Sequence, residues 1–294
     1  MANLERVAVL GASGWVGKTA CNWLTQLDTQ VLAFAGSSRI EKVGELEYRF
    51  EKYDLRKIRD FKPTTIIDAA FLTRERLGAL TVENYITSNT ALIEEALVLQ
   101  RLPTVQKFIG ISSGASVPHL QLQTPNFSID PYGSLKAIYE QCLLQNDELR
   151  AKTTIARIWS VSGSFVTKPS LFAFSNLIQQ ALTGHIDIQA THLVWRRYVD
   201  LEDFIKVVTL ARPGDSRVID SGGRKVELEE LAQLIFAELG QEPSIRRVLT
   251  PGSAEDIYFS DESTWVNAIK GIEFLPLTLE QQISKVTATL KAKI

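Results

Sequence analysis

The stretch GASGWVG, residues 11–17, follows a short apolar run that ends at Leu10 and precedes apolar residues at helical spacing up to Leu27. A glycine-rich turn between a strand and a helix is typical of dinucleotide binding. The first glycine permits a tight turn, the second lets the backbone approach a pyrophosphate, and the third lets the helix pack closely on the strand. Free N–H groups and the positive dipole at the start of the helix attract phosphate. The predicted cofactor-binding residues of this loop are Gly11, Ser13, Gly14, Trp15, Val16 and Gly17.

Two other interpretations of this loop compete. One is a glycine-rich turn that binds nothing, which the flanking strand and helix patterns disfavour. The other is the phosphate-binding loop of nucleoside triphosphatases, because Gly17, Lys18 and Thr19 imitate the end of that motif. That motif needs glycine where this chain has Ala12, and Gly11 stands one residue too early. A shift of one residue would misplace every amide that holds phosphate, so we reject this interpretation.

Apolar runs and helical patterns alternate along the first half of the chain. Strands are predicted at residues 31–35, 65–67, 108–111 and 154–158, and helices at 76–101 and 132–149. Continuous apolar strands separated by helices indicate a parallel sheet covered on both faces. We expect an α/β protein with a Rossmann-type, doubly wound domain at residues 1–165, whose sheet is completed by later segments around 195–212. A smaller lobe at residues 166–294 is expected to bind mainly the substrate.

The composition of the 294-residue chain excludes several classes of function. A net charge of −2 provides no broad basic surface for nucleic acid or anionic lipid. No apolar run approaches the length that spans a bilayer, and the first residues do not resemble a signal peptide. The two cysteines, Cys21 and Cys142, are far apart, which disfavours a disulfide framework or a zinc site. We expect a cytoplasmic protein with no metal, no nucleic acid and no membrane partner.

The nucleotide preference should be decided where the second strand ends, near Gly36. Rossmann folds that bind NAD usually place an acidic residue there, which binds the ribose 2′-hydroxyl. Here Ser37, Ser38 and Arg39 follow instead, and hydroxyls with a guanidinium suit a 2′-phosphate. A solvated loop arginine is the other role open to Arg39. The missing carboxylate is the stronger argument, so we expect NADP(H), with NAD less favoured.

Tyr132 and Lys136 form the second motif. They are four residues apart at the start of a predicted helix and therefore lie on one face. A phenol, with an ordinary pKa of about 10, becomes a useful acid–base group when a nearby ammonium lowers that pKa. We predict that Tyr132 donates a proton to a carbonyl oxygen, while Lys136 lowers its pKa and orients a nicotinamide ribose. An exposed helical pair is the alternative, but the glycine loop upstream makes the motif more specific.

Together these motifs resemble the extended short-chain dehydrogenase/reductase family, also called the NAD-dependent epimerase/dehydratase family, over nearly the whole chain. The resemblance implies cofactor contacts from Asp54 and Leu55 and from the apolar turn that contains Ala69 and Ala70. It also implies a homodimer, because the helices corresponding to 76–101 and 132–149 form the interface in many members of the family.

At the positions that bind substrate in the family, this sequence departs from the family pattern. Counting back from Val117, the family's catalytic serine or threonine falls on Gly114, which has no hydroxyl. Ser113 is the predicted replacement. The predicted substrate-binding residues are Ser112, Gly114, Ser160, which stands where the family has asparagine, and Arg196, which would contact a phosphate.

Three functions remain open. An NADPH-dependent reductase of a nucleotide-linked 4-keto (deoxy)sugar needs a single proton donor, which Tyr132 supplies, and Arg196 suits a diphosphate. A nucleotide-sugar epimerase that retains NAD is the first alternative. The second is a non-catalytic NADP-binding redox sensor, which Gly114 and Ser160 favour. Dehydration is disfavoured, because Ala115 and Ser116 replace the acid–base pair of the sugar dehydratases.

Overall fold

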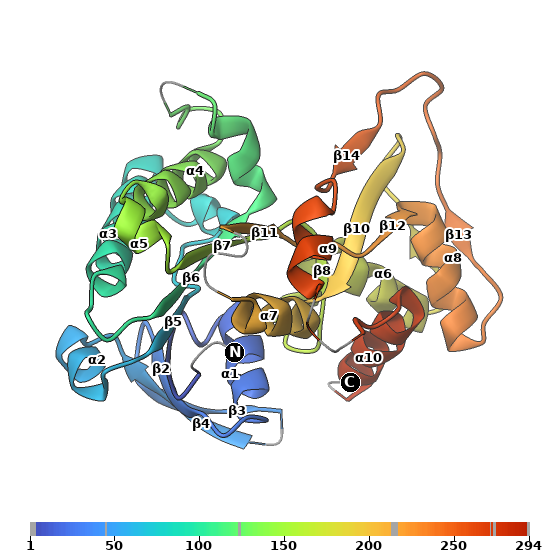
Figure 1. Cartoon of the computed structure of the whole chain (residues 1–294). Coiled ribbons are helices and arrows are strands. Elements are labelled where there is room, and N and C mark those ends of the chain that lie inside the picture. The colour runs from blue at the N-terminus through green and yellow to red at the C-terminus, as the bar shows by residue number, and fades with distance from the viewer. Residues whose placement is uncertain are drawn as a thin grey trace.

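The computed structural model describes residues 4–44, 46–122, 125–212, 217–270, 272 and 275–292. Its centre is an eight-stranded sheet in the order β11-β7-β6-β5-β1-β2-β4-β3 (Figure 1). Neighbouring strands are parallel, except that β3 runs antiparallel to β4. The sheet strands are β1 (Arg6–Leu10), β2 (Gln30–Ala35), β3 (Arg39–Val43), β4 (Leu46–Lys52), β5 (Thr65–Asp68), β6 (Lys107–Ser113), β7 (Thr153–Ile158) and β11 (Val218–Asp220).

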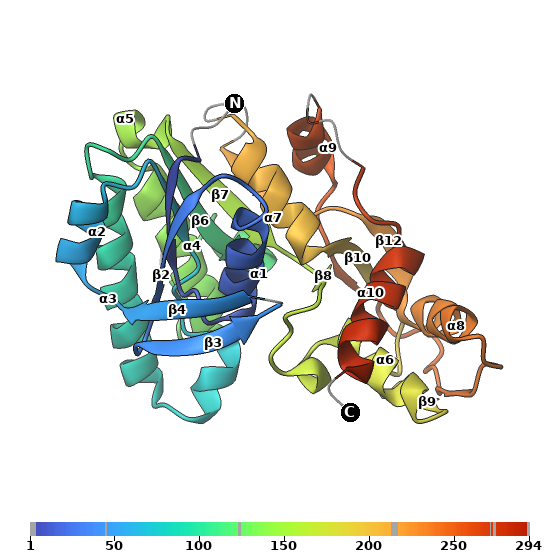
Figure 2. The same cartoon turned by 90° about the horizontal axis from the view of Figure 1, so that it is seen from below.

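Helices cover both faces of this sheet (Figures 1 and 2). Strand β1 shows why: Val7 and Val9 point into the core beneath one helical layer, and Ala8 and Leu10 into the core beneath the other. Side chains alternate along a strand, so a strand buried on both faces is apolar throughout. One layer contains α1 (Trp15–Leu24), α7 (Leu201–Leu210) and α9 (Ser263–Ile269). The other contains α2 (Leu55–Phe61), α3 (Val82–Gln100), α4 (Pro131–Leu144) and α5 (Asp147–Arg150).

A second part of the chain packs around its own apolar core, beside the large sheet (Figure 1). Its main sheet has the order β12-β10-β14, and β8 also pairs with β10. Its elements are β8 (Val161–Ser162), α6 (Ala173–Leu182), β9 (Ile186–Asp187), β10 (Val194–Asp200), β12 (Arg224–Glu227), α8 (Leu228–Leu239), β13 (Ile245–Arg246), β14 (Asp256–Tyr258) and α10 (Leu279–Lys291). The described residues also form the short 3-10 helices η1 (Arg74–Gly78), η2 (Gly114–His119) and η3 (Pro169–Leu171).

The predicted α/β fold, a Rossmann-type sheet of mostly parallel strands, is confirmed. The prediction that segments around 195–212 complete the sheet is wrong, because the added strand is β11. Residues 194–200 form β10, which pairs with β12 and β14 in the second sheet. Helix α7 from the same segment packs on α1 and covers the large sheet.

Two predicted helices have different limits in the structure. The helix expected from residue 76 begins at Val82, where the Thr81 side chain accepts the N–H of Asn84. The helix expected to continue to residue 149 ends at Leu144, because Asn146 caps a new short helix. None of the helices in the described part of the chain is long and apolar enough to cross a membrane.

Candidate active site

The glycine loop lies where the strand order of the sheet reverses. Strand β1 is followed by β2 on one side, whereas β5 lies on the other. Ligands of doubly wound sheets bind at the carboxyl ends of the strands at such a switch point. The loop at residues 11–14 follows the carboxyl end of β1, and Ala69 follows that of β5. The predicted cofactor loop and the turn that contains Ala69 and Ala70 are therefore brought together.

The loop residues fit a pyrophosphate. A Cβ on Gly11 would lie 2.5 Å from the carbonyl oxygen of Ala69, and a Cβ on Gly17 would lie 2.3 Å from that of Gly11. Both positions therefore require glycine for close packing. Gly14 is exposed and caps α1 without any side-chain hydrogen bond, and no acidic residue stands in the first turn of this helix. The N–H groups at the start of α1 are thus available to an anion.

The other predicted loop residues surround this position. Ser13 and Val16 are half-buried. Trp15 is also half-buried, and its ring packs edge-on against Phe172 at 4.8 Å between centroids. Trp15 therefore links the cofactor loop to the second part of the chain.

The strand that follows the turn after β2 contains a carboxylate that the sequence interpretation did not consider. The chain turns into β3, where Glu41 forms ion pairs with Lys18 and, at 3.2 Å, with Nε of Arg39. Burial acts to raise the pKa of Glu41, but the hydrogen bonds and charges of Lys18 and Arg39 lower it overall. Glu41 lies opposite Tyr48 in the β3–β4 hairpin, whereas the end of β2 pairs with Glu51 and Lys52 of β4, so the preference for NADP(H) stays a prediction.

The remaining residues predicted at the adenosine side have local roles. The Arg39 guanidinium donates to Ser37 Oγ at 3.5 Å, and Ser38 Oγ accepts the N–H of Lys52 at 2.8 Å. Asp54 caps α2, because its Oδ1 accepts the N–H of Arg56 at 2.8 Å. Leu55 is the first residue of that helix. The N–H of Ala69 donates to the carbonyl of Leu10, and that of Ala70 to the Asp68 carboxylate.

Tyr132 lies in the first turn of α4 and is half-buried. The helix begins here because Pro131 occupies its first position and Asp130 accepts the N–H of Gly133 at 3.1 Å. The ring of Tyr132 packs edge-on against Phe71 at 6.0 Å, and the guanidinium of Arg74 lies 5.4 Å from its centroid. The side chain of Ser113 hydrogen-bonds the Tyr132 hydroxyl.

The pKa of Tyr132 contradicts the sequence prediction. Burial raises this pKa to about 12, and the hydrogen bond from Ser113 and the Arg74 guanidinium oppose the rise without cancelling it. Lys136 does not lower it: its Nζ donates to the carbonyl of Ile111 at 2.8 Å and lies 3.7 Å from the centre of the Phe71 ring. The positive charge that acts on Tyr132 is therefore that of Arg74.

Lys136 is fully buried on the next turn of α4, where burial lowers its pKa to about 8. Asp68 opposes this shift, and its own carboxylate accepts the Tyr139 hydroxyl at 2.6 Å. Burial raises the pKa of Asp68. The ammonium of Lys136 thus stands between a backbone carbonyl, an aromatic ring and a buried acid.

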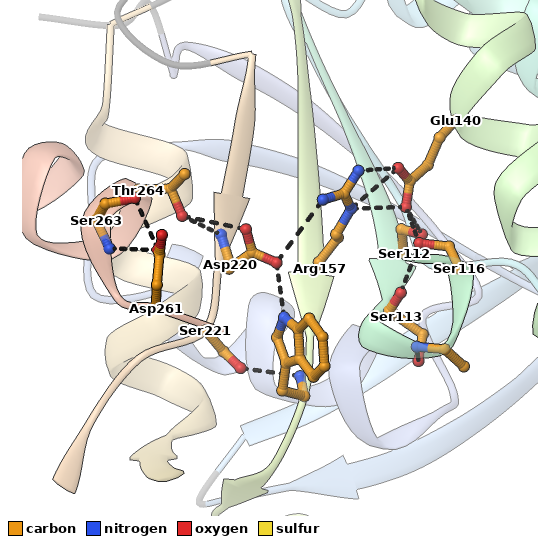
Figure 3. A network of polar contacts seen from close by, with 12 residues as sticks. Ser112, Ser113, Ser116, Glu140, Arg157, Asp220, Ser221, Asp261, Ser263 and Thr264 are labelled. Atoms are coloured by element: carbon orange, nitrogen blue, oxygen red, sulfur yellow. Dashed lines mark hydrogen bonds and ion pairs between the residues drawn. The ribbon is translucent and has the colours of Figure 1, made fainter. Parts of the chain in front are cut away.

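Ser112 belongs to a buried polar network instead of facing a substrate (Figure 3). Its hydroxyl and that of Ser116 both donate to Glu140, and Arg157 binds both oxygens of the same carboxylate. The ion pair between Arg157 Nη2 and Glu140 Oε2 measures 2.6 Å. Asp220 continues the network on the other side of Arg157 (Figure 3). The expected substrate contact of Ser112 is therefore not supported.

Gly114 lies under the indole of Trp159. A Cβ on Gly114 would lie 2.3 Å from Cδ2 of this ring. The indole is held in place because its Nε1 donates to Asp220 Oδ1 at 2.6 Å and its backbone N–H donates to Ser221 Oγ at 2.9 Å. The family's hydroxyl residue is thus absent because Trp159 fills its place.

The two remaining predicted substrate residues lie near this point. Ser160 is half-buried between β7 and β8. Arg196 is on β10, in register with Tyr258 of β14, and its guanidinium lies 5.6 Å from the Tyr258 ring. Asp256 already neutralises Arg196 through a 2.6 Å ion pair.

Several residues of the site escaped the sequence interpretation. Glu140 carried a usable signal, since it follows Lys136 by one helical turn on the face that carries Tyr132. Arg74 and Tyr258 carried none, because they reach the site from segments far away in sequence.

A family model described as "NAD dependent epimerase/dehydratase family" matches residues 7–218. No curated protein sequence matches the chain.

The solved structures share its fold. TunA, an NAD-dependent NDP-hexosamine 5,6-dehydratase of tunicamycin biosynthesis, superposes with a TM-score of 0.75 at 16% identity over 98% of each chain. The UDP-N-acetylglucosamine 4-epimerase from Methanobrevibacter ruminantium gives 0.75 at 18% identity over 100% of each chain. The UDP-glucose 4-epimerase from Thermus thermophilus, solved with NAD, gives 0.74 at 17% identity over 98% of this chain and 100% of that one.

Proposed function

This chain belongs to the NAD dependent epimerase/dehydratase family, a family of NAD-dependent enzymes, and we propose that it is an NADPH-dependent ketoreductase. Its substrate is a nucleotide-linked 4-keto (deoxy)sugar. Tyr132 is the proton donor, and Ser113 supports it. Lys136 orients the nicotinamide ribose, and residues 166–294 supply most of the substrate contacts.

One observation carries the proposal: the Tyr132 phenol is held in its protonated form beside Ser113. A pKa raised to about 12 keeps the proton on this hydroxyl at neutral pH. Reduction of a ketone consumes a proton, so the reaction needs an acid at this place. A phenol that is protonated at neutral pH can supply this proton to the carbonyl oxygen.

NADPH, when bound, supplies the hydride that goes to the carbonyl carbon. The chain's own residues do the rest. The N–H groups at the start of α1 would bind the pyrophosphate, and Lys18 and Arg39 would supply positive charge for the 2′-phosphate. Tyr132 gives its phenolic proton to the carbonyl oxygen, which becomes the hydroxyl of the product.

The substrate class rests on the family and on the position of Arg196. The names of the structural neighbours describe NDP- and UDP-sugars as substrates or ligands of those proteins. Arg196 lies beside Tyr258 at the edge of the site, where it suits a diphosphate. Its ion pair with Asp256 must then be shared with the phosphate.

Steady-state turnover of NADPH with a panel of nucleotide-linked 4-keto sugars tests the proposal. Tyr132→Phe should abolish reduction and still bind NADPH, as measured by fluorescence titration. Tyr198→Phe is the matched control, because Tyr198 is a buried phenol in the separate core of the second part. Unchanged turnover in Tyr132→Phe would remove this residue from the chemistry. Tight NADPH binding without reduction of any ketone would favour the redox sensor.

Glu41 favours a second candidate, an epimerase that retains NAD. A carboxylate near the end of β2 is the group that binds the ribose hydroxyls of NAD, and Glu41 on β3 holds Lys18 of α1 and Arg39 through ion pairs. The two functions differ in the fate of the cofactor. A reductase releases oxidised cofactor in each turnover, whereas an epimerase converts its substrate without net change in cofactor absorbance.

We also propose a cytoplasmic homodimer that associates through α3 and α4. Val82 and Val98 of α3 are exposed apolar side chains, at 48% and 39% of their surface. Cys21 and Cys142 are free thiols, which suits a reducing compartment. Sedimentation equilibrium of the wild type and of Val98→Glu tests the dimer.

A further inference from the structure

Tyr258 is a second phenol at the candidate active site. Its Oη lies 3.4 Å from Oγ of Ser113, and Ser113 also hydrogen-bonds Tyr132. The backbone N–H of Ala115 contacts the same Tyr258 hydroxyl. Ser113 is therefore the bridge between two phenols, one on α4 and one on β14.

The chain has no space for a hydroxyl on residue 114. The Trp159 indole lies against Gly114, and its centroid is 4.9 Å from that of Tyr258. The Trp159 indole thus leaves no space for a hydroxyl on residue 114, and it packs against the Tyr258 ring, which carries a hydroxyl of its own. Ser113 is fixed beside this position, because its Oγ accepts the N–H of Ala115 at 3.2 Å and caps η2.

We propose that Tyr258 supplies the hydrogen-bond donor that Gly114 lacks and that its hydroxyl binds the carbonyl oxygen of the substrate beside Tyr132. This inference rests on the reductase function proposed above. Tyr258 transfers no proton: Tyr132 gives its proton to the carbonyl oxygen, and Tyr258 stabilises the negative charge that develops on this oxygen. A donor fixed in place before the reaction is most effective for such a charge.

The surroundings of Tyr258 suit this role. Burial raises the pKa of Tyr258, so its hydroxyl remains a donor at neutral pH. Strand β14 is held in register by β10, where Arg196 pairs with Tyr258 in the ladder and binds Asp256 two residues earlier. The site is therefore completed by a residue of the second part of the chain.

Steady-state kinetics of Tyr258→Phe tests the inference. Phenylalanine keeps the ring that packs on Trp159 and removes only the hydroxyl. Loss of a donor that acts in the transition state should lower kcat about 10²-fold and leave KM within about threefold. A merely structural role would instead lower the melting temperature or raise KM. Tyr198→Phe, which removes a phenol hydroxyl from the neighbouring strand β10, should leave kcat unchanged.

The outcomes separate this inference from the reductase proposal. If Tyr132→Phe is inactive and Tyr258→Phe turns over like the wild type, Tyr258 has no catalytic role and the reductase proposal stands. A fall in kcat that accompanies loss of thermal stability would also overturn the inference. A wild type that reduces none of the 4-keto sugars would overturn both. A lowered kcat with unchanged melting temperature and NADPH affinity supports the role of Tyr258.

Discussion

Gly114→Ala should destabilise the protein, and the cause should be Trp159. The added methyl carbon would lie 2.3, 2.4 and 2.7 Å from Cδ2, Cε3 and Cε2 of the indole. The ring cannot move freely, because Asp220 binds its Nε1 at 2.6 Å. Overpacking of this kind costs about 1–3 kcal/mol. Gly114 does not have a positive φ, so backbone strain does not add to this cost.

A double-mutant cycle isolates the contact. In a Trp159→Ala background the methyl group meets no indole, so Gly114→Ala should cost nothing, or should stabilise by up to about 1 kcal/mol through the lower chain entropy of alanine. The coupling free energy should therefore be about 1–3 kcal/mol. Gly78→Ala is the matched control, since Gly78 lies in a short helix with nothing within 4 Å of the new methyl group.

Urea denaturation followed by circular dichroism measures the four free energies of unfolding. If Gly114→Ala costs the same with and without Trp159, the indole is not the reason for glycine at this position. The explanation for the missing hydroxyl would then fail as well.

Three further predictions concern the buried charges and the cofactor. Glu140→Ala should cost about 3–5 kcal/mol in urea denaturation, because Arg157 would remain without its bidentate partner; a loss below about 1 kcal/mol would contradict this. Burial lowers the pKa of Lys136 from 10.5 to about 8, so between these pH values the unfolded chain binds the extra proton and stability rises with pH. Relative to Lys136→Met, the free energy of unfolding of the wild type should increase by about 3 kcal/mol from pH 7.5 to 10.5, whereas a constant difference would refute the shift. Glu41→Gln removes a negative charge beside Lys18 and Arg39 and should raise the preference for NADPH over NADH about threefold in fluorescence titrations. An unchanged preference, or a shift toward NADH, would show that Glu41 does not lie beside the 2′-phosphate.

The spacing of Tyr132 and Lys136 shows what the sequence alone can predict about this pair. Their common helix and face follow from a separation of four residues, and the structure places both on α4. The contacts of the Lys136 ammonium are made with Ile111 and Phe71, which lie in other parts of the chain. The predicted effect on the Tyr132 pKa failed for this reason.

The segment after β2 likewise separates what the sequence predicted from what only the structure shows. Gly36 and the polar residues after it were correctly interpreted as the end of a strand. Glu41 was not considered, because only the β3–β4 hairpin brings it back beside Lys18. Glu41 follows Arg39 by two residues, and the groups that its side chain contacts cannot be inferred until the strand pairing is known.

By itself the sequence determined the glycine loop, the alternation of strands and helices and the parallel sheet, because turn chemistry and hydrophobic periodicity act over a few neighbouring residues. Only the tertiary structure decided that Trp159 covers Gly114, that Arg74 approaches Tyr132 and that Tyr258 reaches Ser113. These contacts join residues that are 45, 58 and 145 positions apart. Their geometry depends on how the helices and sheets pack, and that packing is a property of the whole core and of no single segment.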